Sequence, residues 1–85
     1  MEEMPAAGDV GADLFESLRA LRKRLADERQ VPAYVVFSDR TLQGLAARRP
    51  LTRDEFLEVH GVGQKKLEQY GDVFLAEIQR QQDRS

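Results

Sequence analysis

The sequence predicts an all-α fold, in which about five short helices pack into one compact bundle. Apolar residues recur every three or four positions over much of the chain, which is the period of an α-helix. Residues 34–37 favour a β-strand by composition, but the chain offers no second strand to pair with them. Prolines and glycines separate the segments by short connections, which indicate compact neighbours.

The length of 85 residues sets the domain organisation. It is enough for one domain with a thin core, and it leaves no room for a deep substrate cleft. Residues 1–11 are small, polar and interrupted by glycine and proline, so we expect a flexible lead-in or linker there. The helical domain should then occupy residues 12–82, and residues 83–85 should form a frayed tail.

The first helix is expected over residues 12–28. Leucines in this segment are spaced by four, three and four positions and so line one face: Leu14, Leu18, Leu21 and Leu25. The opposite face carries the basic side chains Arg19, Arg22, Lys23 and Arg24. This arrangement predicts an amphipathic helix whose leucine face is buried.

A proline ends this pattern and opens a short helical turn. Pro32 cannot continue a helix interior, but it suits the start of a new turn over residues 33–37. Ser38 or Asp39 should cap the next helix, because short polar side chains satisfy the free N–H groups of a first turn. That helix is expected over residues 39–48, before Pro50.

The second half of the chain predicts three further helical segments. The pattern T-x-x-E that begins at Thr52 is typical of a capping box, and it predicts a helix over residues 53–59. A tight glycine connection follows and leads into a helix over residues 64–70. Gly71 should supply a C-terminal cap or a kink, after which a last helix runs over residues 72–82.

Composition excludes most catalytic chemistries. The chain has no cysteine, one histidine and no phosphate-binding loop for a nucleotide, so we expect no cofactor and no metal site. The neighbours of His60 form no catalytic triad, which favours a turn residue. The sequence shows neither a membrane-spanning apolar run nor a signal-peptide pattern, so we expect a cytoplasmic protein with no membrane partner.

The charge is acidic overall but unevenly distributed. The formal net charge is -2 and the isoelectric point is about 5.4, which disfavours nucleic-acid binding. Residues 1–11 contribute three acids and no base, so the remaining residues carry a small positive charge. Residues 40–66 hold six bases against three acids. A local basic face is therefore compatible with an acidic molecule.

The glycine turn G-V-G-Q-K-K-L is the most informative short motif. Gly61 and Gly63 allow a sharp turn, and Gln64 opens a helix whose free N–H groups favour a phosphate oxygen. Lys65 and Lys66 add positive charge beside this helix end. The pattern is that of a helix-hairpin-helix phosphate contact; the alternative is that the glycines only let two helices pack closely.

Further candidates for nucleic-acid contact are one aromatic and several basic side chains. Tyr34, beside a proline in a short turn, can stack on an unpaired base, or it can pack as a core aromatic. We expect it to be partly exposed, because the apolar residues that follow it are better suited to the core. Arg22 and Lys23 can contact phosphate or form a solvated helix face, and Arg48 can contact phosphate or offset a helix dipole.

The order and spacing of these residues resemble a known family. The chain shows L-F-x-x-L-R-x-L-R-x-x-L-A-x-E from Leu14, V-P-A-Y-V-V-F-S-D-x-T-L from Val31, and V-x-G-V-G-x-x-K-L from Val59. Over residues 13–80 this pattern resembles the HRDC domain of helicases and of RNase D. Within that family it is most similar to the C-terminal domain of bacterial RecQ DNA helicases.

The resemblance implies an HRDC-like bundle, with packing related to SAM and helix-hairpin-helix domains. It implies a non-catalytic accessory domain that binds single-stranded or partly duplex DNA through Tyr34, Lys65 and Lys66. The parent would be an ATP-dependent 3'–5' DNA helicase of repair and recombination, and a ribonuclease of the RNase D type is the other possible parent. The partners would be DNA and the helicase core of the same polypeptide, in a monomer of the bacterial cytoplasm associated with the nucleoid.

The acidic character of the chain departs from what a DNA-binding member should show. Acidic residues surround the glycine turn in the sequence: Asp54, Glu55, Glu58 and Glu68. This departure leaves a second interpretation open. In it the chain is a protein-interaction module that docks on the helicase core or another partner and has little DNA affinity of its own.

Overall fold

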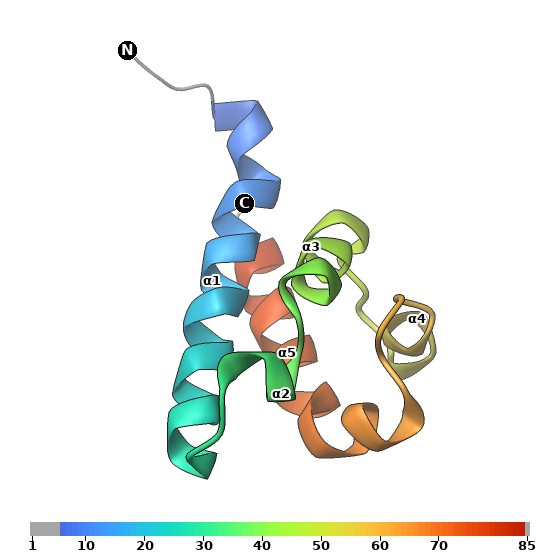
Figure 1. The fold of residues 1–85 in the computed structure, drawn as a ribbon. Coiled ribbons are helices and arrows are strands. Elements are labelled where there is room, and N and C mark those ends of the chain that lie inside the picture. The colour runs from blue at the N-terminus through green and yellow to red at the C-terminus, as the bar shows by residue number, and fades with distance from the viewer. Residues whose placement is uncertain (1–5, 85) are drawn as a thin grey trace.

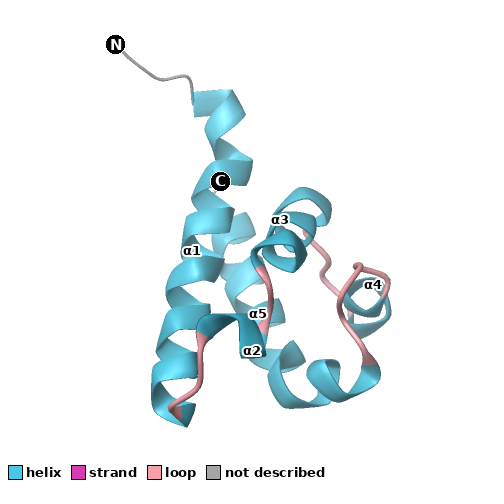
Figure 2. Cartoon of the chain, in the orientation of Figure 1, coloured by secondary structure: helices cyan, strands magenta, loops and turns pink. Residues whose placement is uncertain are grey.

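The computed structural model describes the backbone of residues 6–84 and the side chains of residues 13–84. Over this part of the chain the structure contains helices and no strand (Figure 2). The five helices are α1 (Ala6–Arg29), α2 (Ala33–Val36), α3 (Asp39–Arg48), α4 (Arg53–Leu57) and α5 (Gln64–Asp83). The predicted all-α bundle of about five helices is confirmed.

The two long helices, α1 with 24 residues and α5 with 20, run antiparallel along one side of the bundle (Figure 1). The predicted leucine face of α1 is buried against the core, with Leu25 only partly covered. α1 begins at Ala6, six residues before the predicted start at residue 12. Alanines in this stretch are strong helix formers and extend the helix into a segment that its glycines mark as a lead-in.

α2 is a single helical turn where composition favours a strand. Pro32 stands at its N-terminus in an extended conformation, with φ -62° and ψ 151°. The turn satisfies its own backbone, since the Val35 amide donates to the Pro32 carbonyl at 3.0 Å and the Phe37 amide to the Ala33 carbonyl at 3.4 Å. Helix therefore replaces strand here because no partner strand is needed, as the sequence indicated.

The starts of α3 and α4 follow the predicted capping residues. The Ser38 hydroxyl accepts a hydrogen bond from the Thr41 amide at 3.1 Å, so Ser38 rather than Asp39 is the cap of α3. The Thr52 hydroxyl accepts from the Glu55 amide at 3.1 Å at the start of α4. The reciprocal bond of the capping box differs from the standard pattern, because Glu55 accepts from the Leu51 amide at 3.0 Å.

α5 corrects one prediction. The expected cap or kink at Gly71 does not occur, and α5 is continuous from Gln64 to Asp83. Gly71 is buried in the middle of the helix, and a Cβ atom there would lie 2.6 Å from Cδ1 of Leu67 in the preceding turn. The glycine therefore serves close packing inside the helix rather than its termination.

The core is centred on the ring of Phe37, which lies between α2 and α3. Its centroid lies 5.1 Å from that of Phe74, 5.9 Å from that of Tyr70 and 6.1 Å from that of Phe56. The contacts with Tyr70 and Phe74 are edge-to-face, an arrangement that aromatic pairs prefer. The short α2 turn is thereby anchored to both α4 and α5.

Candidate nucleic-acid interface

Tyr34 projects from α2 into solvent. Val36 and Phe37 occupy the inward side of this turn and are fully or almost fully buried. Tyr34, two positions before Val36, is 71% exposed. The prediction that this tyrosine is exposed rather than a core aromatic is confirmed. An exposed ring on a short turn is a surface on which an unpaired base can stack.

The glycine turn leads to an open helix end. Gly61 has a φ of 92°, and a Cβ there would collide with the side chain of Thr41 on α3. Gly63 is the N-cap of α5, with φ -101°, and it offers no side-chain acceptor to the first amides of the helix. A Cβ at Gly63 would meet no atom within 4 Å. The first N–H groups of α5 are therefore open to an anion from solution.

Basic side chains gather where the end of α1, the α2 turn and the start of α5 meet (Figure 1). Lys65 is exposed, and the Lys66 ammonium donates a hydrogen bond to the Val35 carbonyl. The Arg29 guanidinium lies over the Tyr70 ring, 5.1 Å from its centroid, and the Lys66 ammonium lies 5.8 Å from the same centroid. We call the set Arg29, Tyr34, Gly63, Lys65 and Lys66 the basic end of the bundle.

The closeness of these cations shows in the titration of Lys66. Burial lowers the pKa of Lys66, and the charges of Arg29 and Lys65 lower it further. Arg29 is the one member of this group that the sequence analysis missed. As the last residue of α1 it indicates only an offset of the helix dipole. Its position seven residues after Arg22 places it on the same face of α1, and that spacing was the available signal.

Arg22 is a correction. Its side chain is only 9% exposed, so it belongs neither to a solvated helix face nor to a surface that DNA can reach. One terminal nitrogen of the guanidinium donates to the Phe37 carbonyl at 2.9 Å, and the other lies 2.8 Å from Oδ1 of Asp39. Nε of Arg22 has no hydrogen-bond partner. The residue joins α1 to the connection between α2 and α3, which is a structural role.

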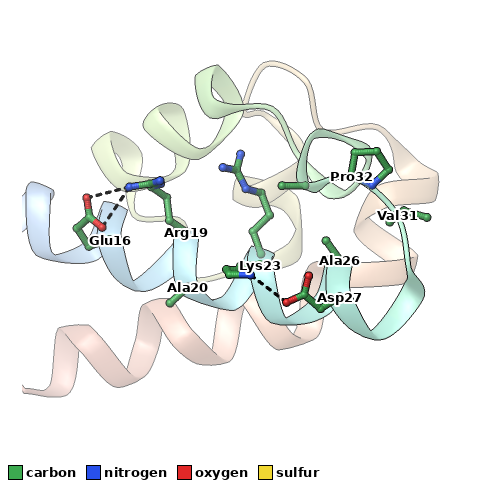
Figure 3. Close-up of a pocket in the computed structure, with 10 residues that line it drawn as sticks. Glu16, Arg19, Ala20, Lys23, Ala26, Asp27, Val31 and Pro32 are labelled. Carbon is green, nitrogen blue, oxygen red and sulfur yellow. Dashed lines mark hydrogen bonds and ion pairs between the residues drawn. The ribbon is translucent and has the colours of Figure 1, made fainter.

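Lys23 lies in a groove of about 530 Å³ between α1 and the Val31–Pro32 connection (Figure 3). Its ammonium pairs with Oδ2 of Asp27 at 3.1 Å, one turn further along the helix. Arg19, on the same groove, lies 3.4 Å from Glu16 in the same manner. These local pairs neutralise much of the positive charge that the sequence suggested for this face.

Arg48 is distant from the basic end. α3 begins close to α2, and Arg48 is its last residue. At 1.5 Å per residue the ten residues of α3 carry Arg48 roughly 14 Å away along the helix axis. Figure 1 shows α3 leading away from α2. Tyr34, Lys66 and the glycine turn therefore converge, whereas Arg48 does not join them.

Other site types can be examined over the same residues. Within the described side chains, no group of three or more histidine, cysteine, aspartate or glutamate residues is arranged to hold a metal ion. No described helix is long and apolar enough to cross a membrane. His60 is exposed in the turn after α4. The candidate site is thus a surface for binding, built from cations, one exposed ring and a helix end.

Comparison with known proteins identifies the same fold and similar sequences. The third HRDC domain of Deinococcus radiodurans RecQ has a TM-score of 0.80 and 47% identity, over 82% of this chain and 92% of that one. Bacillus subtilis ATP-dependent DNA helicase RecQ is 49% identical over 79% of this chain and 11% of its own length. Mycobacterium tuberculosis ATP-dependent DNA helicase UvrD2 is 43% identical over 81% of this chain and 10% of its own.

The chain thus spans about a tenth of the length of the helicases it resembles. The family model of the HRDC domain matches residues 11–78, which include all of α2, α3 and α4 and the basic end described above. The resemblance that the sequence motifs indicated is confirmed by these independent matches. With most of its length covered by that model, and with a close structural counterpart, this chain belongs to the HRDC domain family.

Proposed function

We propose that this chain is a DNA-binding accessory domain of a RecQ-like helicase, and that the basic end is its contact surface. The observation that carries the proposal is the convergence of Tyr34, the open N-terminus of α5 and the nearby cations. Stacking and phosphate contact are the two interactions that single-stranded DNA offers without regard to sequence. A surface that supplies both fits a partner of unpaired or partly duplex DNA.

The start of α5 is suited to a backbone phosphate. Gly63 places no side chain over the first amides, and the first turn contains no acidic residue. The positive end of the helix dipole favours an anion at this point. Lys65 adds a full positive charge from the same turn, since it has no hydrogen bond or ion pair among the described side chains.

The affinity of the isolated domain should be modest. A base stacked on Tyr34 contributes about 1–3 kcal/mol. About three cations can neutralise phosphates, which predicts a slope near -2 for log K against log salt on a single strand. Weak, salt-sensitive binding is suited to a domain that tunes which DNA structures a helicase engages, while the ATP-dependent 3'–5' motor lies elsewhere in the polypeptide. This role belongs to DNA repair and recombination at the bacterial nucleoid.

The test is a fluorescence anisotropy titration of the chain with a labelled oligothymidine at low salt. We expect saturable binding in the micromolar range or weaker that declines as salt is raised. Tyr34→Ala should weaken binding about tenfold, because it removes the stacking surface without opening the core. Leu57→Ala is a matched control, since Leu57 is 37% exposed on α4, a helix that contributes nothing to the basic end. Absence of saturable binding at low salt would refute the proposal.

A second candidate function is docking on the helicase core. It is favoured by the surface around α4, where Leu51 and Leu57 are 40% and 37% exposed beside the acidic side chains of Asp54 and Glu58. Exposed leucines with an acidic rim are suited to a basic, partly apolar protein surface. Glu55 is less useful as a probe of this idea, because its carboxylate accepts from the Leu51 amide and helps to shape the start of α4.

Charge reversal separates the two candidates. In the docking hypothesis Glu58→Lys changes the DNA-structure preference of the full-length parent and leaves the strand affinity of the isolated domain unaltered. In the DNA-binding hypothesis Lys65→Glu lowers the strand affinity of the isolated domain, whereas Glu58→Lys has little effect in either assay. If Glu58→Lys is silent in the full-length protein, the docking hypothesis fails.

A further inference from the structure

Lys66 holds two elements together. Its ammonium, on the first turn of α5, donates to the carbonyl of Val35, the residue next to Tyr34 on α2. A four-residue helix has no stability of its own, because nucleation costs more than one turn of hydrogen bonds returns. Pro32 supplies no side-chain cap to this turn. The position of the exposed Tyr34 ring therefore depends on contacts that α2 receives from neighbouring helices.

Arg29 is differently placed although it lies beside Lys66. Its guanidinium rests on the Tyr70 ring, 5.1 Å from the centroid, and among the described side chains it forms no ion pair. A guanidinium that contacts a ring through its face keeps the N–H donors at its edge available. Those donors can bind a phosphate in two-pronged fashion, which an ammonium cannot do.

We propose a division of roles within the basic end: Lys66 is a positioning residue that holds α2 and Tyr34 in place, and Arg29 is the cation that contacts phosphate. The proposal rests on the DNA-binding function proposed above and assigns roles within that site. A Lys66 ammonium bound to the Val35 carbonyl has already committed a donor, so that engaging phosphate fully would release α2. Arg29 has no such commitment.

The desolvation of Lys66 supports this assignment. Burial lowers the pKa of Lys66, and Arg29 and Lys65 lower it further, so that its charge is held less firmly than that of an exposed lysine. An arginine side chain stays charged at any physiological pH. Of the two cations on the Tyr70 ring, Arg29 is therefore the more constant source of positive charge for a phosphate.

The experiment compares Arg29→Met and Lys66→Met, which remove the charge and the donors but keep an unbranched side chain. Two quantities are measured on each variant: the salt slope of binding to labelled oligothymidine, and the hydrogen exchange of the Val35 and Phe37 amides, which close the α2 turn. Arg84→Met is the matched control, because Arg84 follows the opposite end of α5.

We expect Arg29→Met to reduce the salt slope by about 0.7, the value for one phosphate contact on a single strand, with unchanged exchange in α2. Lys66→Met should leave the slope within about 0.2 of the wild type, far below the loss for one contact, yet weaken binding and speed exchange of both amides several-fold. Arg84→Met should change neither quantity.

Two results would overturn the assignment. A slope reduced by Lys66→Met without faster exchange in α2 would make Lys66 the phosphate contact, and an unchanged slope for Arg29→Met would remove Arg29 from the site. If the wild-type chain binds no strand at low salt, the DNA-binding function and the role of Arg29 fail together. The exchange measurement still decides the role of Lys66, because it needs no DNA.

Discussion

At the scale of single residues, Gly61 and Gly63 show that two glycines of one turn can serve different purposes. Gly61 holds a positive φ and lies against Thr41, where a side chain cannot fit. Gly63 has an ordinary extended conformation with open space around its Cα, so the fold does not require a glycine there. What its small size preserves is access to the amides of α5.

This difference gives a paired prediction. Gly61→Ala should destabilise the fold by roughly 1–3 kcal/mol, because the φ angle and the contact with Thr41 both oppose a Cβ. Gly63→Asp should leave stability equal or slightly higher, since aspartate is a favoured N-cap, but should weaken DNA binding by occupying the open amides with a negative charge. Urea unfolding and anisotropy titration of both variants check this. Equal loss of stability in the two variants would contradict it.

Arg22 illustrates where reasoning from the sequence reached its limit at this scale. It follows Leu18 by four positions, so a helical wheel places it at the edge of the buried stripe as much as on the basic face. Its true partner is the carbonyl of Phe37, fifteen residues away and across a turn. A backbone acceptor has no signature in the sequence, and tertiary contacts of this kind are invisible until the elements are placed.

At the scale of elements, the boundaries of α3 were predictable and the continuity of α5 was not. Ser38 and Pro50 bracket α3 by local chemistry alone, and the observed helix matches the predicted residues 39–48. Gly71 carries the usual local signal for a helix end, but burial against Leu67 overrides it. Tertiary packing decides such a case, and a single sequence does not report it.

The contact between α1 and α5 includes a polar junction at Glu77, whose carboxylate accepts from the Ser17 hydroxyl and pairs with Arg80. Burial raises the pKa of Glu77, but hydrogen bonds from Arg80, Ser17 and Gln81 and the charge of Arg80 outweigh burial, and the pKa lies below its ordinary value. A depressed pKa contributes stability above the unfolded pKa of about 4.3, and this contribution is lost as pH falls through the folded pKa.

Glu77→Gln should therefore destabilise the fold by about 1 kcal/mol at neutral pH, because it removes a charge-assisted acceptor. The difference from wild type should shrink as pH is lowered below about 4.3, where the wild-type side chain also becomes neutral. Urea unfolding over a pH series measures both curves. Glu58→Gln, at an exposed position on the far side of α4, should show no such pH-dependent difference. Parallel curves for wild type and Glu77→Gln would exclude the junction as a source of stability.

At the scale of the whole molecule, Phe37 connects the short elements to the long ones. Its ring contacts the aromatic rings of Phe56, Tyr70 and Phe74, so α4 and α5 share one aromatic centre with the α2 turn. The sequence predicted that this residue is a core candidate and that the fold is an HRDC-like bundle. It could not predict which distant side chains meet there, because the packing order of helices is not written in their periodicity.

Removal of this ring should affect the entire domain. Phe37→Ala should cost about 3–5 kcal/mol, a large part of the stability of a domain of this size, and Phe37→Leu should cost roughly half as much. Urea unfolding followed by circular dichroism measures both. Leu57→Ala, at a partly exposed position on α4, should cost less than about 1 kcal/mol. A loss at Phe37 no larger than that at Leu57 would show that the aromatic centre is not the hub of the fold.

The antiparallel arrangement of α1 and α5 gives the domain two ends with different properties (Figure 1). Lys65 and Lys66 lie on the first turn of α5, and at 1.5 Å per residue the last turn of that 20-residue helix lies about 30 Å away. A fluorophore, bead or sensor surface attached after Arg84 is therefore held well clear of Tyr34. The C-terminus can serve as a handle, so that the domain can be tethered for force or surface measurements with Tyr34 directed into solution.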